Sequence, residues 1–254
     1  MGSTLADLAY GICALVALLV GGRLVRLGLR TRQLPELVFG AATLTQILAG
    51  LGFWLLPPLL PEPAIWTGAA ATLGVEAAGT IGVGLGCWLI FRRGQGWAVA
   101  AALGVALLAV GTTAARLALS DPSQASAATP LGHGDRLPLA QALTNVGVAT
   151  AYGWLALEAV RYGLLMRRRL RLGLDRPIVV HQFLLWGVAS GAIFLINVAV
   201  IAVVTATGRP PEEIAWAHGG TALVGLVGAA ALWCSFFPPR AYRAWADRGA
   251  EAAG

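Results

Sequence analysis

The sequence predicts an all-α membrane protein, a polytopic bundle of seven transmembrane helices, from its composition, its apolar stretches and its arginines. Hydrophobic residues make up 57% of the 254 residues and charged residues only 12%, against about a quarter in a soluble domain. Seven apolar stretches each reach the ~20 residues that a helix needs to cross the hydrocarbon core. Arginine supplies all 18 basic residues, and 15 of them fall in four clusters with two apolar stretches between successive clusters. We therefore expect one membrane domain over residues 1–254.

The first three expected helices cover residues 5–25, 37–56 and 64–91. An arginine-rich turn that ends at Pro35 separates the first from the second. The second ends at Pro57-Pro58, because proline has a fixed φ and no backbone N–H to donate. The third runs to a tight turn at residues 92–96, which contains two arginines and two glycines.

The other four expected helices cover residues 97–119, 139–160, 178–207 and 214–237. The longest loop, 120–138, is rich in Ser, Ala, Gly and Pro and is expected to be external. Pro177 begins the sixth helix, and Pro238-Pro239 ends the seventh. Residues 238–254 then form a short, arginine-bearing cytoplasmic tail.

The arginine clusters orient the bundle. They are Arg23, Arg26, Arg30 and Arg32; Arg92 and Arg93; Arg161, Arg167, Arg168, Arg169, Arg171 and Arg176; and Arg240, Arg243 and Arg248. Every cluster returns to one side of the membrane, which the positive-inside rule makes cytoplasmic. We expect an external N-terminus, a cytoplasmic C-terminus and a bacterial-type inner membrane. The arginines form no separate basic module, so we expect contact with anionic lipid headgroups and not with nucleic acid.

Helices one to three and five to seven share an orientation, and a parallel 3+1+3 repeat is one interpretation. In both triplets the second helix follows a proline and the third begins near a tryptophan, Trp66 or Trp216. Some transporters contain such repeats. The favoured alternative is that Pro and Trp recur wherever membrane helices begin and end. Small residues at GxxxG spacing, Gly82/Gly86 and Gly187/Gly191, also predict close helix packing.

Glu76 is the strongest candidate for a functional residue. It lies roughly twelve residues into the third expected helix, which places it near the bilayer midplane at about 1.5 Å per residue. A carboxylate there costs several kcal/mol unless it is paired or protonated, so it is expected to face the bundle interior. Gln46 lies at similar depth and is the expected hydrogen-bond partner. A proton-coupling role and a structural interhelical bond are the two interpretations.

Four further polar residues fall in the outer half of the membrane by residue counting: Arg116, Asn145, Asn197 and His218. Together they predict a polar vestibule above Glu76. Arg116 is alternatively long enough to reach water at the membrane surface, and the other three alternatively bond between helices. Glu158 lies near the inner boundary and is expected to pair with Arg161.

The sequence argues against common cofactors and catalytic sites. Seven helices with an external N-terminus are also the topology of opsins, but the chain has no lysine for a retinal Schiff base. His181 and His218 lie near opposite membrane faces and His133 lies in a loop, so two histidines are not expected to clamp one haem iron. Ser190 and His218 differ in depth, which opposes an intramembrane protease because a nucleophile needs its base nearby. No cofactor, metal or enzyme activity is predicted.

Two function classes remain open. The first is a sensor module or accessory subunit that binds a small ligand or a membrane partner through the vestibule. Its cytoplasmic basic face, formed by Arg167, Arg168, Arg169 and Arg171, could dock an acidic partner, and a homo-oligomer is a further option. The second class is a small-solute transporter coupled to protons through Glu76. Binding is favoured, because one central carboxylate without a broken helix is little for coupled transport.

Overall fold

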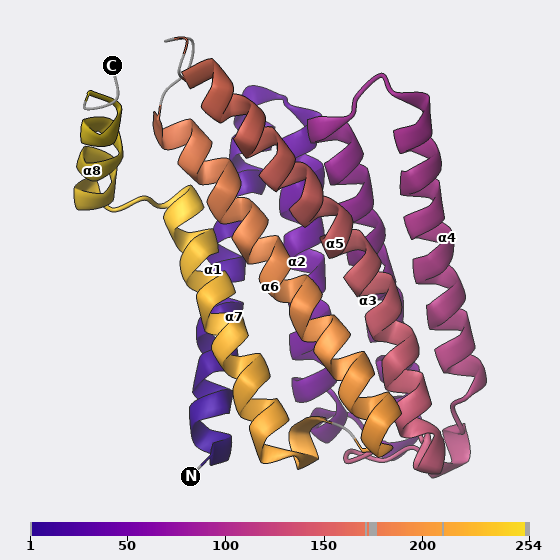
Figure 1. The fold of residues 1–254 in the computed structure, drawn as a ribbon. Helices are drawn as coiled ribbons and strands as arrows, with labels where there is room; N and C mark the ends of the chain where they lie inside the picture. Colours follow the sequence, from indigo (N-terminus) through magenta and orange to yellow (C-terminus); the bar gives the residue numbers. More distant parts are fainter. Residues whose placement is uncertain (1, 171, 173–176, 210, 252–254) are drawn as a thin grey trace.

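The computed structural model describes residues 2–170, 172, 177–209 and 211–251, and the chain is 88% helix without strands in this part. Seven long helices run side by side (Figure 1). They are α1 (Gly2–Thr31), α2 (Leu34–Leu55), α3 (Glu62–Phe91), α4 (Gly96–Ala118), α5 (Leu137–Leu170), α6 (Pro177–Thr207) and α7 (Ala215–Phe236). A shorter helix, α8 (Arg240–Glu251), follows α7. Each expected membrane stretch is therefore helical.

Prolines and glycines set the helix ends where the sequence predicts them. Pro35 lies in the first turn of α2, where its missing N–H removes no helical hydrogen bond. Pro57–Leu59 forms a short 3-10 turn after α2. Gly94, between α3 and α4, has a φ of 90°, a left-handed conformation that glycine adopts without a Cβ clash.

Helix α5 departs most from its expected bounds. It was expected over residues 139–160 but runs from Leu137 to Leu170, so it continues for almost three turns beyond the apolar stretch, at about 3.6 residues per turn. Leucine and arginine are strong helix formers, and no proline interrupts residues 161–170. The arginines in this segment therefore project from a helix and not from a loop.

Six of the long helices are long and apolar enough to cross a membrane: α1, α2, α3, α4, α6 and α7. Helix α5 is less apolar because it carries Gln141, Asn145 and Glu158 within its length. It packs against α3, α4 and α6, so many of its side chains face other helices instead of lipid. These features identify a helical membrane protein, while a seventh span at α5 stays a prediction.

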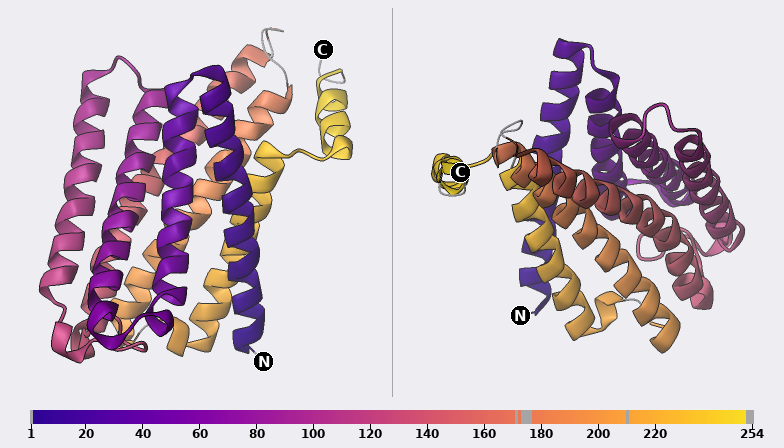
Figure 2. Two further views of the ribbon diagram at one scale, coloured as in Figure 1. Left: turned by 180° about the vertical axis from the view of Figure 1, so that it is seen from behind. Right: turned by 45° about the horizontal axis from the view of Figure 1, so that its top comes forward.

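The helices follow one another around the bundle. α1, α2 and α3 pack in sequence, as do α5, α6 and α7, and the two groups meet where α7 contacts α1 and α3 contacts α5. Helix α4 packs against α3 and α5 at one side (Figure 2). The α1–α2 and α3–α4 turns lie at the same end as α8, opposite the N-terminus (Figure 1). The described parts of the four arginine clusters therefore share one end, as the predicted orientation requires.

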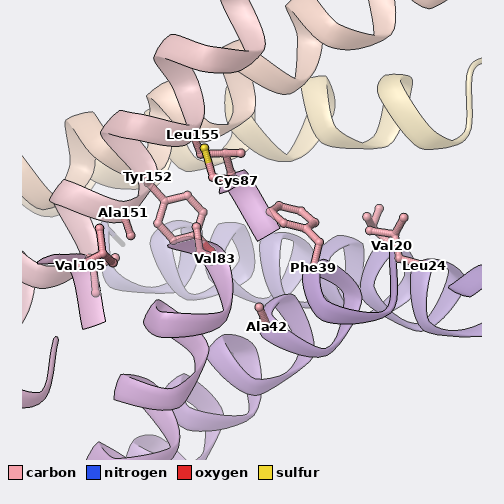
Figure 3. Packing of buried hydrophobic residues seen from close by; sticks show 11 residues of the cluster. Val20, Leu24, Phe39, Ala42, Val83, Cys87, Val105, Ala151, Tyr152 and Leu155 are labelled. Atoms are coloured by element: carbon pink, nitrogen blue, oxygen red, sulfur yellow. The ribbon is translucent and has the colours of Figure 1, made fainter. Parts of the chain in front are cut away.

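The largest buried apolar cluster joins α1 through α5, and Figure 3 labels most of its members. Tight contact between α2 and α3 adjoins it. A Cβ on Gly82 would lie 2.7 Å from the Cβ of Ala42, and one on Gly86 would lie 3.0 Å from the ring of Phe39. Larger residues would push the helices apart, so the close packing predicted for this GxxxG pair is confirmed.

Candidate functional site

A cavity of about 260 Å³ lies between the α1–α2 pair and helices α5, α6 and α7. We call it the central cavity. Its wall is mainly apolar, with alanines, glycines, aliphatic side chains and the rings of Phe39 and Trp186. Hydroxyl and amide groups reach it from Thr43, Tyr152, Ser190 and Gln46, and none of the described side chains that line it is charged.

Two polar groups of the central cavity are available to a ligand. Tyr152 is 8% exposed and Ser190 is 2% exposed, and neither hydroxyl forms a hydrogen bond with a described residue. By contrast, Thr43 Oγ1 donates to a carbonyl of its own helix at 2.9 Å, and Gln46 Nε2 donates to Thr80 Oγ1 at 2.7 Å. A buried hydroxyl without a partner is unfavourable by about 1–3 kcal/mol, so a ligand that bonds to it gains affinity.

Ser190 has no histidine beside it. A Cβ on Gly228 of α7 would lie 2.9 Å from the Cβ of Ala192, so this part of α6 packs near Gly228. His218 lies about ten residues earlier in α7, or about 15 Å along the helix axis. It packs instead on the ring of Tyr10, with ring centroids 5.8 Å apart. Ser190 and His218 therefore do not form a nucleophile–base pair.

A second interior site lies between α3, α4 and α5. We call it the polar seam, and it consists of Glu76, Thr80, Thr112, Thr113, Arg116 and Thr144. Beside Glu76 it contains a partly open space of about 10 Å³, which is roughly the room that a single water molecule needs. Glu76 is half-buried, and its carboxylate accepts no hydrogen bond from any described residue.

Gln46 does not bind the Glu76 carboxylate, and this prediction was wrong. The Gln46 amide donates to Thr80 Oγ1 at 2.7 Å and to the backbone carbonyl of Glu76 at 3.4 Å. A Cβ on Gly79 would lie 2.8 Å from Gln46 Cγ, so the close packing at Gly79 holds the Gln46 side chain against the α3 backbone. Residue counting gives the depth of a side chain but not its direction.

The Arg116 side chain points toward neighbouring helices and does not extend to the membrane surface. Its Nη1 donates to Thr144 Oγ1 at 2.8 Å, its guanidinium lies 5.1 Å from the centre of the Phe53 ring, and its Nε is buried without a hydrogen-bond partner. No direct ion pair joins it to Glu76, the other charged residue of the polar seam. Of the two interpretations of Arg116, the geometry favours an interior role.

His133 covers the end of the polar seam that lies beside the α4–α5 loop, and the sequence did not single it out as a site residue. Its Nε2 lies 3.1 Å from the carbonyl oxygen of Arg116. Burial lowers the pKa of His133, the hydrogen bond to Arg116 partly opposes this, and the Arg116 charge lowers the pKa further. Gly132 and Gly134 flank it with φ values of 63° and 52°. This Gly-His-Gly run is the sequence signal for a fixed loop conformation.

The vestibule expected from Arg116, Asn145, Asn197 and His218 is not formed as one site. Asn145 Nδ2 donates to the carbonyl of Gln141 and Asn197 Nδ2 to that of Ile193, each at 2.8 Å and within its own helix. His218 faces α1, while Arg116 lies in the polar seam. Arg116 and His218 therefore lie on different interfaces, and the two asparagine amides bond within their own helices, because similar depth does not place side chains on facing sides of their helices.

A buried ion pair joins α3 to α5. Arg92 Nη2 lies 2.8 Å from Glu158 Oε1, and both side chains are 10% exposed. The predicted pairing of Glu158 with Arg161 was wrong, because Glu158 pairs with Arg92 and the Arg161 side chain is exposed. The Arg92 guanidinium also lies 5.1 Å from the centre of the Trp97 ring, so α4 covers the pair.

No three His, Cys, Asp or Glu side chains of the described residues are grouped closely enough to hold a metal ion. His181 Nδ1 lies 3.0 Å from the Tyr242 hydroxyl of α8, far from the loop that carries His133. Of the expected basic face, Arg167, Arg168 and Arg169 are exposed near the end of α5, and Arg171 lies outside the described residues.

Comparisons of the chain with protein families, with curated proteins and with solved structures find no match. The apolar helices indicate a membrane protein. Within it, the central cavity and the polar seam are the two interior features on which a function can be proposed.

Proposed function

We propose that the protein is a seven-span membrane protein of a bacterial inner membrane, with its N-terminus outside, and that its central cavity binds a small uncharged ligand. The observation that carries this proposal is an interior cavity of about 260 Å³ with two unpaired hydroxyls, those of Tyr152 and Ser190. Ligand sites are typically concave and apolar, with a few polar groups that fix orientation.

The wall of the cavity restricts the chemistry of the ligand. A charged ligand would lose its hydration without gaining a counter-charge, which is strongly unfavourable. The volume is slightly below the ~300–1,000 Å³ that is typical of ligand pockets, which favours a compact molecule. The expected ligand is therefore small, mainly apolar, and able to exchange hydrogen bonds with the Tyr152 and Ser190 hydroxyls.

The position of the cavity supports a role as a sensor module or accessory subunit. Its wall combines α1 and α2 with α5, α6 and α7, so a ligand contacts both groups of helices. A ligand shifts a conformational equilibrium only when it binds the two states with different affinities. A ligand that contacts both groups of helices would bind two arrangements of these groups with different affinities. The exposed arginines at the end of α5 would contact a membrane partner.

Thermal shift and native mass spectrometry test the proposal with a panel of small uncharged aromatic alcohols and amides. At least one compound should stabilise the parent protein, and Ser190→Ala and Tyr152→Phe should each weaken it by about 0.5–1.5 kcal/mol, the net value of one hydrogen bond. Ala17→Leu should abolish binding by filling the cavity, while Ala199→Leu on the exposed face of α6 should not. Equal binding by the parent and Ala17→Leu would refute the proposal.

Proton-coupled solute transport is the second candidate, and the half-buried Glu76 carboxylate, which has no hydrogen-bond partner among the described residues, supports it. Ionisable groups inside membrane bundles commonly serve as proton relays. In proteoliposomes under a pH gradient, the parent should drive solute uptake or proton flux, and Glu76→Gln should abolish it. Glu62→Gln, at the exposed start of the same helix, is the matched control and should retain it. Proton flux that persists in Glu76→Gln would exclude this role.

A further inference from the structure

We propose that a groove on the outer surface of α5 and α6 holds an anionic phospholipid, with the phosphate at Arg161 and Arg168 and one acyl chain along the groove. The groove has a volume of about 640 Å³. It shares no lining residue with the central cavity or the polar seam, so the inference is independent of the ligand and transport proposals above.

One face of α5 forms most of the groove. It contributes Leu157, Val160, Arg161, Leu164, Leu165 and Arg168, whose spacing of three and four residues places them on one side of the helix. Leu157 is 73% exposed and Leu164 is 49% exposed. Large apolar side chains of a membrane helix that are this exposed are suited to contact acyl chains.

Helix α6 contributes two glycines, which leave the groove hollow. At Gly187 an added Cβ would lie 2.6 Å from a methyl group of Val160, so the two helices touch there. At Gly191 the nearest atom to an added Cβ is the Cβ of Ala156, at 4.0 Å. The predicted GxxxG pair on α6 is therefore used for helix contact at Gly187 only, and the space beside Gly191 is open.

The charge of the groove selects the headgroup. Arg161 and Arg168 lie two turns apart, about 10 Å along the axis, and neither contacts a carboxylate among the described residues. They lie toward the arginine-rich end, whereas Ala156 and Gly191 lie deeper. From Arg168 to Ala156 the groove spans about 18 Å along the axis, which accommodates most of an extended acyl chain below a headgroup. Basic pockets between membrane helices are suited to anionic lipid headgroups.

A second copy of the chain fits this groove less well. A copy in the same membrane has its own Arg161 and Arg168 at the same depth, and a two-fold interface brings the same surface patch of both copies together. Four arginines would then face one another. An anionic lipid brings the opposite charge and also fills the apolar part of the groove.

Native mass spectrometry of the full-length protein, with equal amounts of dioleoyl phosphatidylglycerol and dioleoyl phosphatidylcholine, tests the proposal. The parent should retain phosphatidylglycerol preferentially. Arg161→Gln and Arg168→Gln should each lower that preference about fivefold, the equivalent of roughly 1 kcal/mol per arginine at a membrane surface. Arg93→Gln, which removes an exposed arginine at the same end, should leave it unchanged.

Gly191→Leu distinguishes a lipid bound in the groove from an anionic lipid that is only attracted to the positive charge of the arginines. It fills the open space and keeps both arginines, so it should reduce retention of phosphatidylglycerol. Unchanged retention in Gly191→Leu, an equal loss in Arg93→Gln, or competition by inorganic phosphate alone would overturn the proposal. A parent dimer that dissociates in Gly191→Leu would also overturn it, because the groove would then be an interface between copies.

Discussion

Two charged residues, Glu76 within α3 and Arg92 directly after its last residue, meet their opposite charges in different ways. Arg92 contacts Glu158 directly at 2.8 Å. About 24 Å away along the same helix, Glu76 faces Arg116 across the polar seam, and the Arg116 guanidinium donates to Thr144 instead. The first pair satisfies its charges inside the fold and joins α3 to α5. The second leaves the Glu76 carboxylate beside a small polar space. There the carboxylate can take up a proton or accept a hydrogen bond from a water molecule.

Breaking the Arg92–Glu158 pair should give the largest loss of stability. Glu158→Gln leaves the Arg92 guanidinium buried without its counter-charge, which typically destabilises by about 3–5 kcal/mol. We expect the free energy of unfolding in mixed micelles, followed by circular dichroism, to fall by that amount.

The double variant Arg92→Met with Glu158→Leu is the control for this pair. Replacing a whole buried ion pair with apolar side chains is often neutral or stabilising, so most of the loss should be recovered. A loss below about 1 kcal/mol in Glu158→Gln alone would mean that water reaches the pair and that it does not hold α3 to α5.

Arg116→Met should have an intermediate effect. It removes the bond to Thr144, the contact with the Phe53 ring and the positive charge nearest the Glu76 carboxylate. A hydrogen bond to a charged group is worth about 1.5–3 kcal/mol, and we expect a loss of unfolding free energy in that range. In a double-mutant cycle, Glu76→Gln should recover part of the loss if the two charges interact. Strict additivity would show that they are independent.

The contrast between these sites also shows what the sequence can predict. Apolar lengths, prolines and arginine clusters predicted the helices and their shared basic end, because these signals depend on position along the chain. The pairing of Glu158 with Arg161, of Gln46 with the Glu76 carboxylate, and the single vestibule were wrong. Each of these predictions depended on the rotation of a helix about its own axis, which decides the neighbour that a side chain faces. Packing sets that rotation, for example the contact of Gly79 with Gln46, and the depth of a residue does not reveal it.

Glu76→Gln in the parent background should change stability by less than about 1 kcal/mol, because no ion pair or hydrogen bond to the carboxylate is lost and a neutral amide is easier to bury. Thermal unfolding in detergent measures this. A loss as large as that of Glu158→Gln would remove the distinction between the two sites, since Glu76 would then be a structural partner as well.

His133 should give the smallest effect, visible only as a pH dependence at the Arg116 end. The pKa of His133 is lower in the fold than in the unfolded chain, chiefly through burial, so the unfolded state binds the proton first as the pH falls. Its contribution to stability is therefore present above the ordinary histidine pKa of about 6.5 and is lost as the pH falls below it toward the folded value. Thermal unfolding on both sides of this pH should show a smaller pH-dependent loss of stability in His133→Gln than in the parent.

His218→Gln, which alters a histidine outside the loop, should behave as the parent does in this comparison. An identical pH dependence in His133→Gln and the parent would mean that the loop opens freely to water and that His133 does not cover the polar seam.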